Sequence, residues 1–385
     1  MGEPFKNLLG AREVHAAASH LARASADGRR GAFAADRFVK QALAGLAELE
    51  FKARAEHLAD ALEAALPGSF AAACDLIEAA LAPARDHDAD ADAPPAASDA
   101  GLSGWIVWPL GEFVARRGLA EPERALAALH ALTRRFSAEW AIRPFIAAHP
   151  ELAFRTLAAW TRDPSAHVRR LVSEGSRPRL PWGRQLAALI ADPRPTFPLL
   201  LALQDDPSPY VRRSVANHLN DVARDHPELV ADWLHTHLPG ASPERHALLR
   251  HASRSLIKAG HPRTLAAFGL GAAFLGTARF TVTPQHLTLG DSLALELELS
   301  SSASAPQRLV IDYVVHHVKA SGASSPKVFK GWSCTLAPRQ RLTLSKRHPV
   351  RPISTRRYYP GLHRVELQIN GSVHAGASFH LRLAP

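Results

Sequence analysis

Two segments of the chain repeat each other at a distance of 43 residues. The segment DPSAHVRRLVSEG begins at Asp163, and DPSPYVRRSVANHLND begins at Asp206. Asp and Pro favour a helix start, because the Asp side chain caps free N–H groups and Pro is accepted at the first helical position. The tetrapeptide HPEL also recurs, at 149–152 and 226–229, as the start of a second helix in two repeats. Repeats of this length predict stacked helix pairs, an α-solenoid, which commonly presents a concave binding face.

The pattern of apolar residues divides the chain into a helical part and a β part. Residues 1–82 carry Ala and Leu at helical spacing, 83–101 are acidic and rich in Pro, and 102–276 hold the repeats. From residue 277 apolar and polar residues alternate, and Asn370-Gly371 predicts a tight hairpin turn. We therefore predict a multidomain chain. An all-α HEAT-like repeat solenoid, continuous with the N-terminal helices and interrupted by a flexible loop at 83–101, precedes an all-β Ig-like sandwich at 277–385.

The positive charge is concentrated in the β part. The chain has 46 Lys and Arg against 36 Asp and Glu, a formal net charge of +10. From residue 277 onward, 14 basic residues stand against 5 acidic ones, so this part alone carries +9. A basic module beside a near-neutral one suggests a polyanionic partner, and a basic domain without such a role is the alternative.

The basic residues of the β part gather in two predicted loops, 319–331 and 345–361. Binding of phosphates by such loops is independent of sequence and falls steeply with salt. Tyr358 or Tyr359 beside them is either a structural corner residue or a residue that stacks on a base. The residues of these loops that we expect to contact DNA are Lys327, Lys330, Arg356 and Arg357.

Several classes of protein do not fit the chain. Cys74 and Cys334 are far apart and match no metal or redox spacing, so we expect no disulfide and a reducing, cytoplasmic environment. No long apolar stretch and no secretion signal are apparent, so we expect no membrane partner. No heptad pattern argues for an oligomer, and we expect a monomer.

Three predicted helices carry a carboxylate in the same column as an arginine. These columns are Glu139 with Arg143, Arg170 with Glu174, and Arg213 with Asn217 and Asp221. Each is spaced by one turn on the side away from an apolar stripe. Taken singly, such pairs are ordinary surface ion pairs worth about 0.2–0.5 kcal/mol. If the helices stack as a solenoid, however, the columns can converge. Trp182, taken alone, is expected to pack in the core.

The same segments resemble a known family. SAEWAIRPFI, VRRLVSEGSRPRLPW and DDPSPYVRRSVANHLNDVARDHPEL are similar to the AlkC branch of the HEAT-like DNA alkylation repair glycosylases. GLSGWIVWPLGEFVARRG, at 101–118, resembles the segment that precedes them in that family. The resemblance is strongest over 101–235, and the β part fits as well, because some members carry a C-terminal Ig-like domain. One departure is Trp140, where the family pattern has Phe.

This resemblance implies an enzyme of base-excision repair in a bacterial, nucleoid-associated setting. It would hydrolyse the N-glycosidic bond of cationic bases such as 3-methyladenine and 3-methylcytosine in double-stranded DNA. A cationic base leaves as a neutral molecule, so little general acid catalysis is needed. Carboxylates would stabilise the positive charge that develops on the sugar and would position water. The resemblance implies no metal and no cofactor.

The family pattern also implies roles for individual residues within 102–276. Glu139 and Asp221 would be the catalytic carboxylates nearest the sugar and water, and Glu174 a third one or a partner of Arg170. Trp182 would lie against the lesion nucleotide with its π face, and Arg170 and Arg213 would hold phosphate or orient the acids. The remaining residues that we expect to contact DNA here are Trp140, Arg143, Arg213 and Asn217.

Two other functions fit the sequence. A non-catalytic HEAT-like protein that binds bent or branched DNA would keep the arginines and lose the carboxylates, so the presence of three carboxylates argues against it. A protein-interaction scaffold, the commonest use of α-solenoids, predicts no preference for nucleic acid. The salt dependence of duplex binding separates these readings, since it is steep for a DNA-binding protein and absent for a scaffold.

Overall fold

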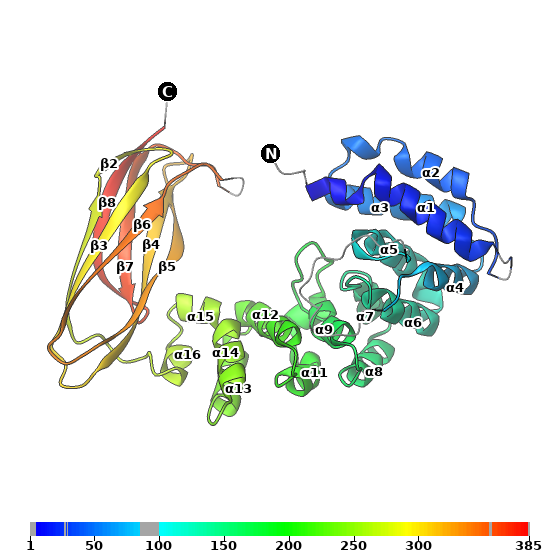
Figure 1. Ribbon diagram of the computed structural model, residues 1–385. Helices are drawn as coiled ribbons and strands as arrows, with labels where there is room; N and C mark the ends of the chain where they lie inside the picture. The colour runs from blue at the N-terminus through cyan, green and yellow to red at the C-terminus, as the bar shows by residue number, and fades with distance from the viewer. Residues whose placement is uncertain (1–4, 27, 29, 85–99, 354–355, 384–385) are drawn as a thin grey trace. The chain divides into compact units, whose positions relative to one another are not determined.

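The computed structural model describes residues 5–26, 28, 30–84, 100–353 and 356–383. The chain forms two compact units. The first comprises residues 1–225 and 242–252 and is built of helices, as Figure 1 shows. The second comprises residues 226–241 and 253–385 and contains three helices and two β-sheets. The all-α and all-β parts predicted from the sequence are therefore both present.

The first unit is a succession of short helices that begins with a 3₁₀ helix, η1 (Phe5–Leu9). Its α-helices are α1 (Ala11–Ser25), α2 (Ala35–Leu43), α3 (Phe51–Ala65), α4 (Phe70–Ala80), α5 (Val107–Arg117), α6 (Pro122–Thr133), α7 (Arg143–Ala148), α8 (Pro150–Trp160), α9 (Ala166–Gly175), α10 (Ala187–Ala191), α11 (Phe197–Leu203), α12 (Pro209–Asp225) and α14 (Pro243–Ala252). The predicted loop at 83–101 falls mainly on residues 85–99, which lie outside the described residues.

The two DPS segments precede α9 and α12, as predicted, but their prolines lie outside the helices. Asp163 Oδ1 accepts the N–H of Ser165 at 2.8 Å, and Asp206 Oδ1 accepts that of Ser208 at 2.9 Å. Each Asp therefore closes a turn just before the helix. The apolar stripes of both helices are buried, and α12 packs against α9 on one side and α14 on the other.

The segment SAEWAIRPFI is not one helix, contrary to our prediction. Residues 139–142 form turns, and α7 begins only at Arg143. Glu139 and Arg143 therefore do not share one face of a helix, and the column that we predicted for them does not exist.

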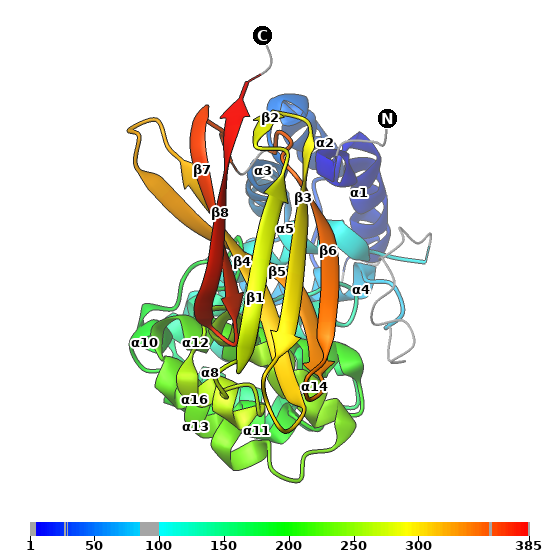
Figure 2. The same ribbon diagram turned by 90° about the vertical axis from the view of Figure 1, so that its left-hand side faces the viewer.

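The second unit contains two sheets that pack face to face. Its helices are α13 (Pro227–His237), α15 (Arg254–Lys258) and α16 (Pro262–Ala267), and its strands are β1 (Gly276–Thr283), β2 (His286–Thr288), β3 (Ser292–Ser301), β4 (Gln307–Val318), β5 (Ser324–Leu336), β6 (Arg341–Pro349), β7 (Gly361–Ile369) and β8 (Ser372–Arg382). One sheet has the order β1-β3-β6 and the other β2-β8-β7-β4-β5 (Figure 2). All pairings are antiparallel except that of β2 with β8.

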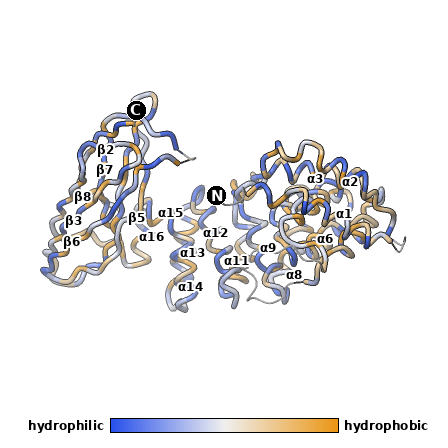
Figure 3. Tube along the Cα trace, turned by 45° about the horizontal axis from the view of Figure 1, so that its top comes forward, coloured by the Kyte–Doolittle hydropathy of each residue, from blue (hydrophilic) through white to orange (hydrophobic). Residues whose placement is uncertain are grey.

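The core of the sandwich is formed by the apolar residues that alternate with polar residues along the strands. Leu293, Leu295, Leu297 and Leu299 of β3 are buried, while the residues between them face outward. Figure 3 shows hydrophobic and hydrophilic residues alternating along the strands. Asn370 and Gly371 connect β7 to β8 with positive φ at both positions, which confirms the predicted hairpin turn.

Of the two basic segments predicted as loops, the first is in large part a strand and the second is a strand only at its ends. Residues 324–331 belong to β5, and residues 345–349 belong to β6. Tyr358 is buried in the core of the sandwich, so of its two proposed roles the structural one fits this residue, and not stacking on a base. The change from helices to strands lies between Ala267 and Gly276, whereas the second compact unit also includes α13, α15 and α16. Within the described residues, no helix is long and apolar enough to cross a membrane.

Candidate active site

Five charged side chains of the first unit form a chain in which acids and bases alternate. Arg170 donates from Nη1 to Glu139 and lies 3.6 Å from Glu174 through Nη2. Arg177 donates to Glu174 from Nη1, and its Nε and Nη2 bind the two oxygens of Asp221 at 2.8 and 3.0 Å. The order Glu139–Arg170–Glu174–Arg177–Asp221 thus links the three carboxylates that the sequence singled out. We call this set the carboxylate network.

The carboxylate network depends on the packing of neighbouring repeats. Arg170 and Glu174 are one turn apart on α9, and Asp221 lies near the end of α12, which packs against α9. Glu139 comes from the turn before α7, and Arg177 from the segment that follows α9. Four elements therefore supply the five side chains, and the sequence showed only the spacing within α9 and α12.

Two hydroxyl groups complete the hydrogen bonding of the carboxylates. Ser137 donates to Glu139 Oε2 at 2.8 Å and accepts from Arg170 at 2.7 Å. Ser214 of α12 donates to Glu174 Oε2 at 2.6 Å. The guanidinium of Arg170 also lies over the ring of Tyr210, 5.2 Å from its centroid. Arg170 is therefore held on two sides, by Glu139 and by an aromatic face.

Burial and charge oppose each other in this network. Glu139 and Glu174 are only 8% and 5% exposed. Burial raises the pKa of Glu174, but the charges of Arg170 and Arg177, together with hydrogen bonds from Ser214 and Arg177, outweigh it, so that its pKa is lowered. Burial likewise opposes the charge of Arg177, but its bonds to Asp221 and Glu174 raise its pKa. Glu174 and Arg177 therefore stay ionised near neutral pH.

The side chain of Arg143 is not accessible to a partner in this structure, which argues against the DNA contact that we expected for it. Its side chain is fully buried, and its nitrogens donate to the carbonyl oxygens of Gly175, Arg177, Pro178 and Arg184. A guanidinium with no exposed surface cannot reach a phosphate. Burial and the charge of Arg177 lower its pKa to about 10. Arg143 instead fixes the backbone of the segment 175–184, which carries Arg177 and Trp182.

Trp182 is exposed, although taken alone it was expected to pack in the core. Its side chain is 56% accessible, and its backbone has φ of +63°. A bulky residue in the left-handed region costs on the order of 1–3 kcal/mol, and such residues cluster at functional sites. Trp140 lies beside it, with ring centroids 6.4 Å apart, and donates from Nε1 to the carbonyl of Pro181 at 3.1 Å. This bond and those of Arg143 hold Trp182 at the surface.

Trp182 belongs to a cluster of aromatic rings that the sequence did not predict. Its ring is nearly parallel to that of Trp108, at 2° and 6.2 Å between centroids. The other members are Phe5, Phe51, Trp105, Phe136 and Trp140. They come from segments up to 177 residues apart, from Phe5 to Trp182, so no local pattern could reveal the cluster.

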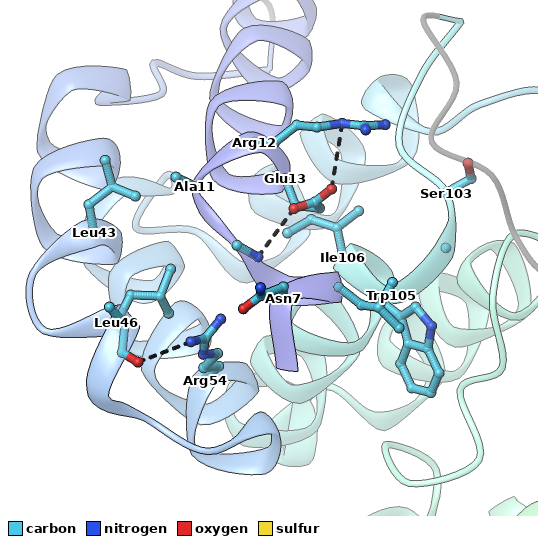
Figure 4. Close-up of a pocket in the computed structure, with 14 residues that line it drawn as sticks. Asn7, Ala11, Arg12, Glu13, Leu43, Leu46, Arg54, Ser103, Trp105 and Ile106 are labelled. Carbon is cyan, nitrogen blue, oxygen red and sulfur yellow. Dashed lines mark hydrogen bonds and ion pairs between the residues drawn. The ribbon is translucent and has the colours of Figure 1, made fainter. Parts of the chain in front are cut away.

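A hollow of about 600 Å³ lies next to Trp105 at the start of α1 (Figure 4). Its polar groups serve the fold. Glu13 Oε2 accepts the N–H of Gly10 at 3.2 Å, which caps α1. Arg54 donates to four backbone carbonyls, including those of Lys6 and Leu9 in η1. We therefore conclude that the polar residues lining this hollow stabilise the fold and do not belong to the active site.

Arg213 and Asn217 line the outer side of α12, two turns and one turn before Asp221, respectively. Arg213 is exposed and Asn217 is half-buried, with its Oδ1 3.2 Å from His251 Nε2 of α14. Their position on the column of Asp221 agrees with the spacing in the sequence. Their contact with DNA stays a prediction.

The predicted DNA-contacting residues of the β part lie on the second unit. Lys327 and Lys330 are exposed on β5, which is an edge strand. Arg357 is exposed above the ring of Tyr359, whereas Arg356 points Nη1 at His317 Nε2, 2.8 Å away. Three of the four are thus open to a partner, and Arg356 has a contact within the fold.

Sequence reasoning missed two further polar residues of the site, Arg177 and His218. Arg177 follows the end of α9 and takes part in no periodic pattern. His218 is fully buried, with Nδ1 2.9 Å from the carbonyl of Ser173, and burial lowers its pKa to about 4. The imidazole of His218 is therefore neutral near pH 7 and lies against the residue that precedes Glu174. Among the described residues, no group of three or more His, Cys, Asp or Glu could hold a metal ion.

Comparison with known proteins agrees with this architecture. A family model described as the C-terminal Ig-like domain of the uncharacterised protein YhaZ matches residues 276–383. The uncharacterized protein YhaZ of Bacillus subtilis (strain 168) is 36% identical over 286 residues, covering 73% of this chain and 77% of the relative. The solved structure of Pseudomonas fluorescens alkylpurine DNA glycosylase AlkC, bound to DNA containing an abasic site analog, superposes with a TM-score of 0.88. It is 36% identical, over 99% of this chain and 100% of that one. The chain therefore belongs to the AlkC family.

Proposed function

We propose that this chain is a DNA glycosylase of alkylation repair that hydrolyses the N-glycosidic bond of cationic bases such as 3-methyladenine and 3-methylcytosine. The observation that carries the proposal is the carboxylate network, together with an exposed tryptophan, Trp182, that stacks on the neighbour of Glu139 in the sequence, Trp140. It occurs in a chain that matches an alkylpurine DNA glycosylase over its whole length. The proposed partner is double-stranded DNA, and the proposed setting is the bacterial nucleoid.

The chemistry of a cationic lesion suits a site made of carboxylates. An N3-alkylated base carries its positive charge before the bond breaks and leaves as a neutral molecule. The barrier then lies in the deoxyribose, which gains positive charge as the C1′–N bond lengthens. Ionised carboxylates held in place before the reaction stabilise that charge without reorganisation. A general acid is not required.

The network divides these tasks among its members. We propose that Glu139 and Asp221, at the two ends of the carboxylate network, lie nearest the sugar and the attacking water. Each end carboxylate has one arginine neighbour, while Glu174 between them has two. The charge of Glu174 is therefore the most fully neutralised, which fits a role in orienting the arginines.

Trp182 and the basic residues would hold the DNA. The exposed indole of Trp182 offers its π face to a cationic base, and such contacts favour a cation over a neutral ring. Lys327, Lys330 and Arg357 on the second unit offer charge to phosphates, which supplies affinity without sequence preference. Selectivity would then come from the charge and lability of the lesion.

The test is base release from methylated DNA. We compare the wild type with Glu139→Gln and Asp221→Asn, which keep the shape and remove the charge, and measure duplex binding of each variant in parallel. Release of 3-methyladenine by the wild type, lost in a variant that still binds DNA, supports the proposal. Binding without any release by the wild type would contradict it and favour the non-catalytic DNA binder.

A further inference from the structure

Arg169 and Arg212 occupy the same position in two successive repeats. Arg169 follows Asp163-Pro164-Ser165, and Arg212 follows Asp206-Pro207-Ser208 at the same spacing. Arg169 Nη1 donates to the carbonyls of Asp163 and Pro164, both at 2.9 Å. Arg212 Nη1 donates to the carbonyls of Asp206 and Pro207, at 2.6 and 2.8 Å. In both repeats the guanidinium is therefore held in one orientation by the backbone of the turn before the helix.

The other edge of the guanidinium is used differently in the two repeats. Arg169 binds the carboxylate of Asp206 through Nε and Nη2, at 2.7 and 3.0 Å, and this ion pair joins its repeat to the next one. The residue that corresponds to Asp206 in the following repeat is Gly240, two residues before Ser242. In the part of the chain that the structure describes, no carboxylate forms an ion pair with Arg212. The guanidinium of Arg212 is therefore held in a fixed orientation, while its Nε–Nη2 edge, which can bind a carboxylate or a phosphate through two hydrogen bonds, has no carboxylate paired with it among the described residues.

Arg212 lines a groove between α12 and α14. The groove has a volume of about 470 Å³, and Arg212, Arg213 and His251 line it together with Ala247. One acid, Glu244, also lines it, and its pKa is lowered by hydrogen bonds with its own backbone N–H and with Ser242 and, less, by the charge of Arg212. Two arginines against one carboxylate leave the groove with net positive charge. Arg213 on the same helix is exposed to solvent at this point.

We propose that the groove between α12 and α14 binds a backbone phosphate of DNA through the Nε–Nη2 edge of Arg212. The proposal rests on the proposed function, because it takes the anion from a DNA substrate. The phosphate would take the place that Asp206 occupies against Arg169 in the preceding repeat. Arg guanidinium binds phosphate in the same two-nitrogen geometry as carboxylate.

The experiment measures binding to undamaged duplex DNA as a function of salt. Each phosphate contact contributes about 0.9 to the slope of log K against log salt. We expect Arg212→Ala to lower the slope by about that amount, so that its deficit in affinity shrinks roughly 3.5-fold between about 50 and about 200 mM salt. Arg212→Lys keeps the charge and loses the two-nitrogen edge, and it should bind more weakly than the wild type at low salt.

A second pair of variants avoids Arg212, whose removal also deprives the turn before α12 of hydrogen bonds. Ala247 is exposed on α14 and lines the groove, so Ala247→Glu introduces a carboxylate opposite Arg212. Ala247→Gln is the matched control, with the same size and no charge. We expect Ala247→Glu to lower the slope as Arg212→Ala does, the double variant to lower it no further, and Ala247→Gln to leave it unchanged.

The outcomes separate this proposal from the proposed function. Equal slopes for the wild type, Arg212→Ala and Ala247→Glu overturn the phosphate site, even where the wild type releases methylated bases. A lowered slope in both variants supports the site, even where the wild type releases no base and the glycosylase proposal fails. If inorganic phosphate stabilises the wild type but not Arg212→Ala while the DNA slopes stay equal, the groove is a site for free phosphate and the proposal is wrong. A wild type that does not bind duplex overturns both.

Discussion

Replacing Arg177 by methionine tests how strongly the carboxylate network depends on the arginine between two acids. Arg177 binds Asp221 through two nitrogens and contacts Glu174, and the three side chains are only 10%, 14% and 6% exposed. Methionine has a similar length and no charge, so it leaves two buried carboxylates without their shared cation. Removing one partner of a buried ion pair costs about 3–5 kcal/mol. We expect about 3 kcal/mol, because Arg170 still lies beside Glu174.

A loss of about 3 kcal/mol lowers the Tm of a domain of this size by about 6–12 °C. The loss should depend on pH. Because its pKa is lowered in the folded state, the Glu174 carboxylate contributes stability above its unfolded pKa, and this contribution is lost as the pH falls through the folded pKa. In the variant the contribution is already missing at neutral pH. The difference in Tm between the two proteins is therefore largest near neutral pH and shrinks as the pH falls below about 4.

Thermal unfolding followed by circular dichroism over this pH range measures the difference. Arg179→Met is the matched control. Arg179 binds both oxygens of Asp225, at 2.7 and 3.0 Å, so the geometry is the same, but both side chains are more exposed. Solvent screens such a pair, and its loss should leave the Tm nearly unchanged. Equal effects of the two substitutions, or an unchanged Tm for Arg177→Met near neutral pH, would refute the argument from burial.

Three further predictions follow from the same structure. Trp182→Ala should leave the Tm nearly unchanged, because the ring is exposed. It should slow single-turnover base release by about tenfold, because the stacking of Trp182 on the nucleotide is lost. An unchanged rate of base release would exclude Trp182 from the active site. Arg143→Met leaves buried carbonyls without donors, so the free energy of unfolding should fall by about 3 kcal/mol or more in denaturant titration, and a smaller loss would show that water replaces the guanidinium. Burial lowers the pKa of His317 to about 3 and that of His348 to about 4, so the stability that these neutral side chains contribute is complete above about pH 6.5. It is lost as the pH falls toward the two pKa values, by up to about 1.4 kcal/mol per pH unit for each histidine. His348→Asn should make the free energy of unfolding depend less on pH, and an unchanged pH dependence would contradict the lowered pKa of His348.

Local patterns in the sequence were sufficient for the elements of the fold. The repeated DPS segments predict the starts of α9 and α12 because turn closure and capping act within a few residues. The alternation in β3 predicts its buried face because side chains of a strand alternate by geometry. Asn370-Gly371 predicts a hairpin because few residues accept positive φ. The spacing of Arg170 with Glu174, and of Arg213 with Asp221, correctly placed each set on one helical face.

The tertiary structure alone decided which of these side chains meet and which are buried. Arg143 faces the interior because a turn, and not a helix, precedes it, so spacing by four residues no longer means a shared face. Arg177 joins Glu174 to Asp221 across 44 residues of sequence, and Trp182 is exposed because distant donors fix its backbone in the left-handed region. Strand β5 and the end of β6 extend into segments predicted as loops, since cross-strand partners, not the basic residues themselves, stabilise an extended backbone. Contacts of this kind depend on where the chain returns in space, and no short-range pattern carries that information.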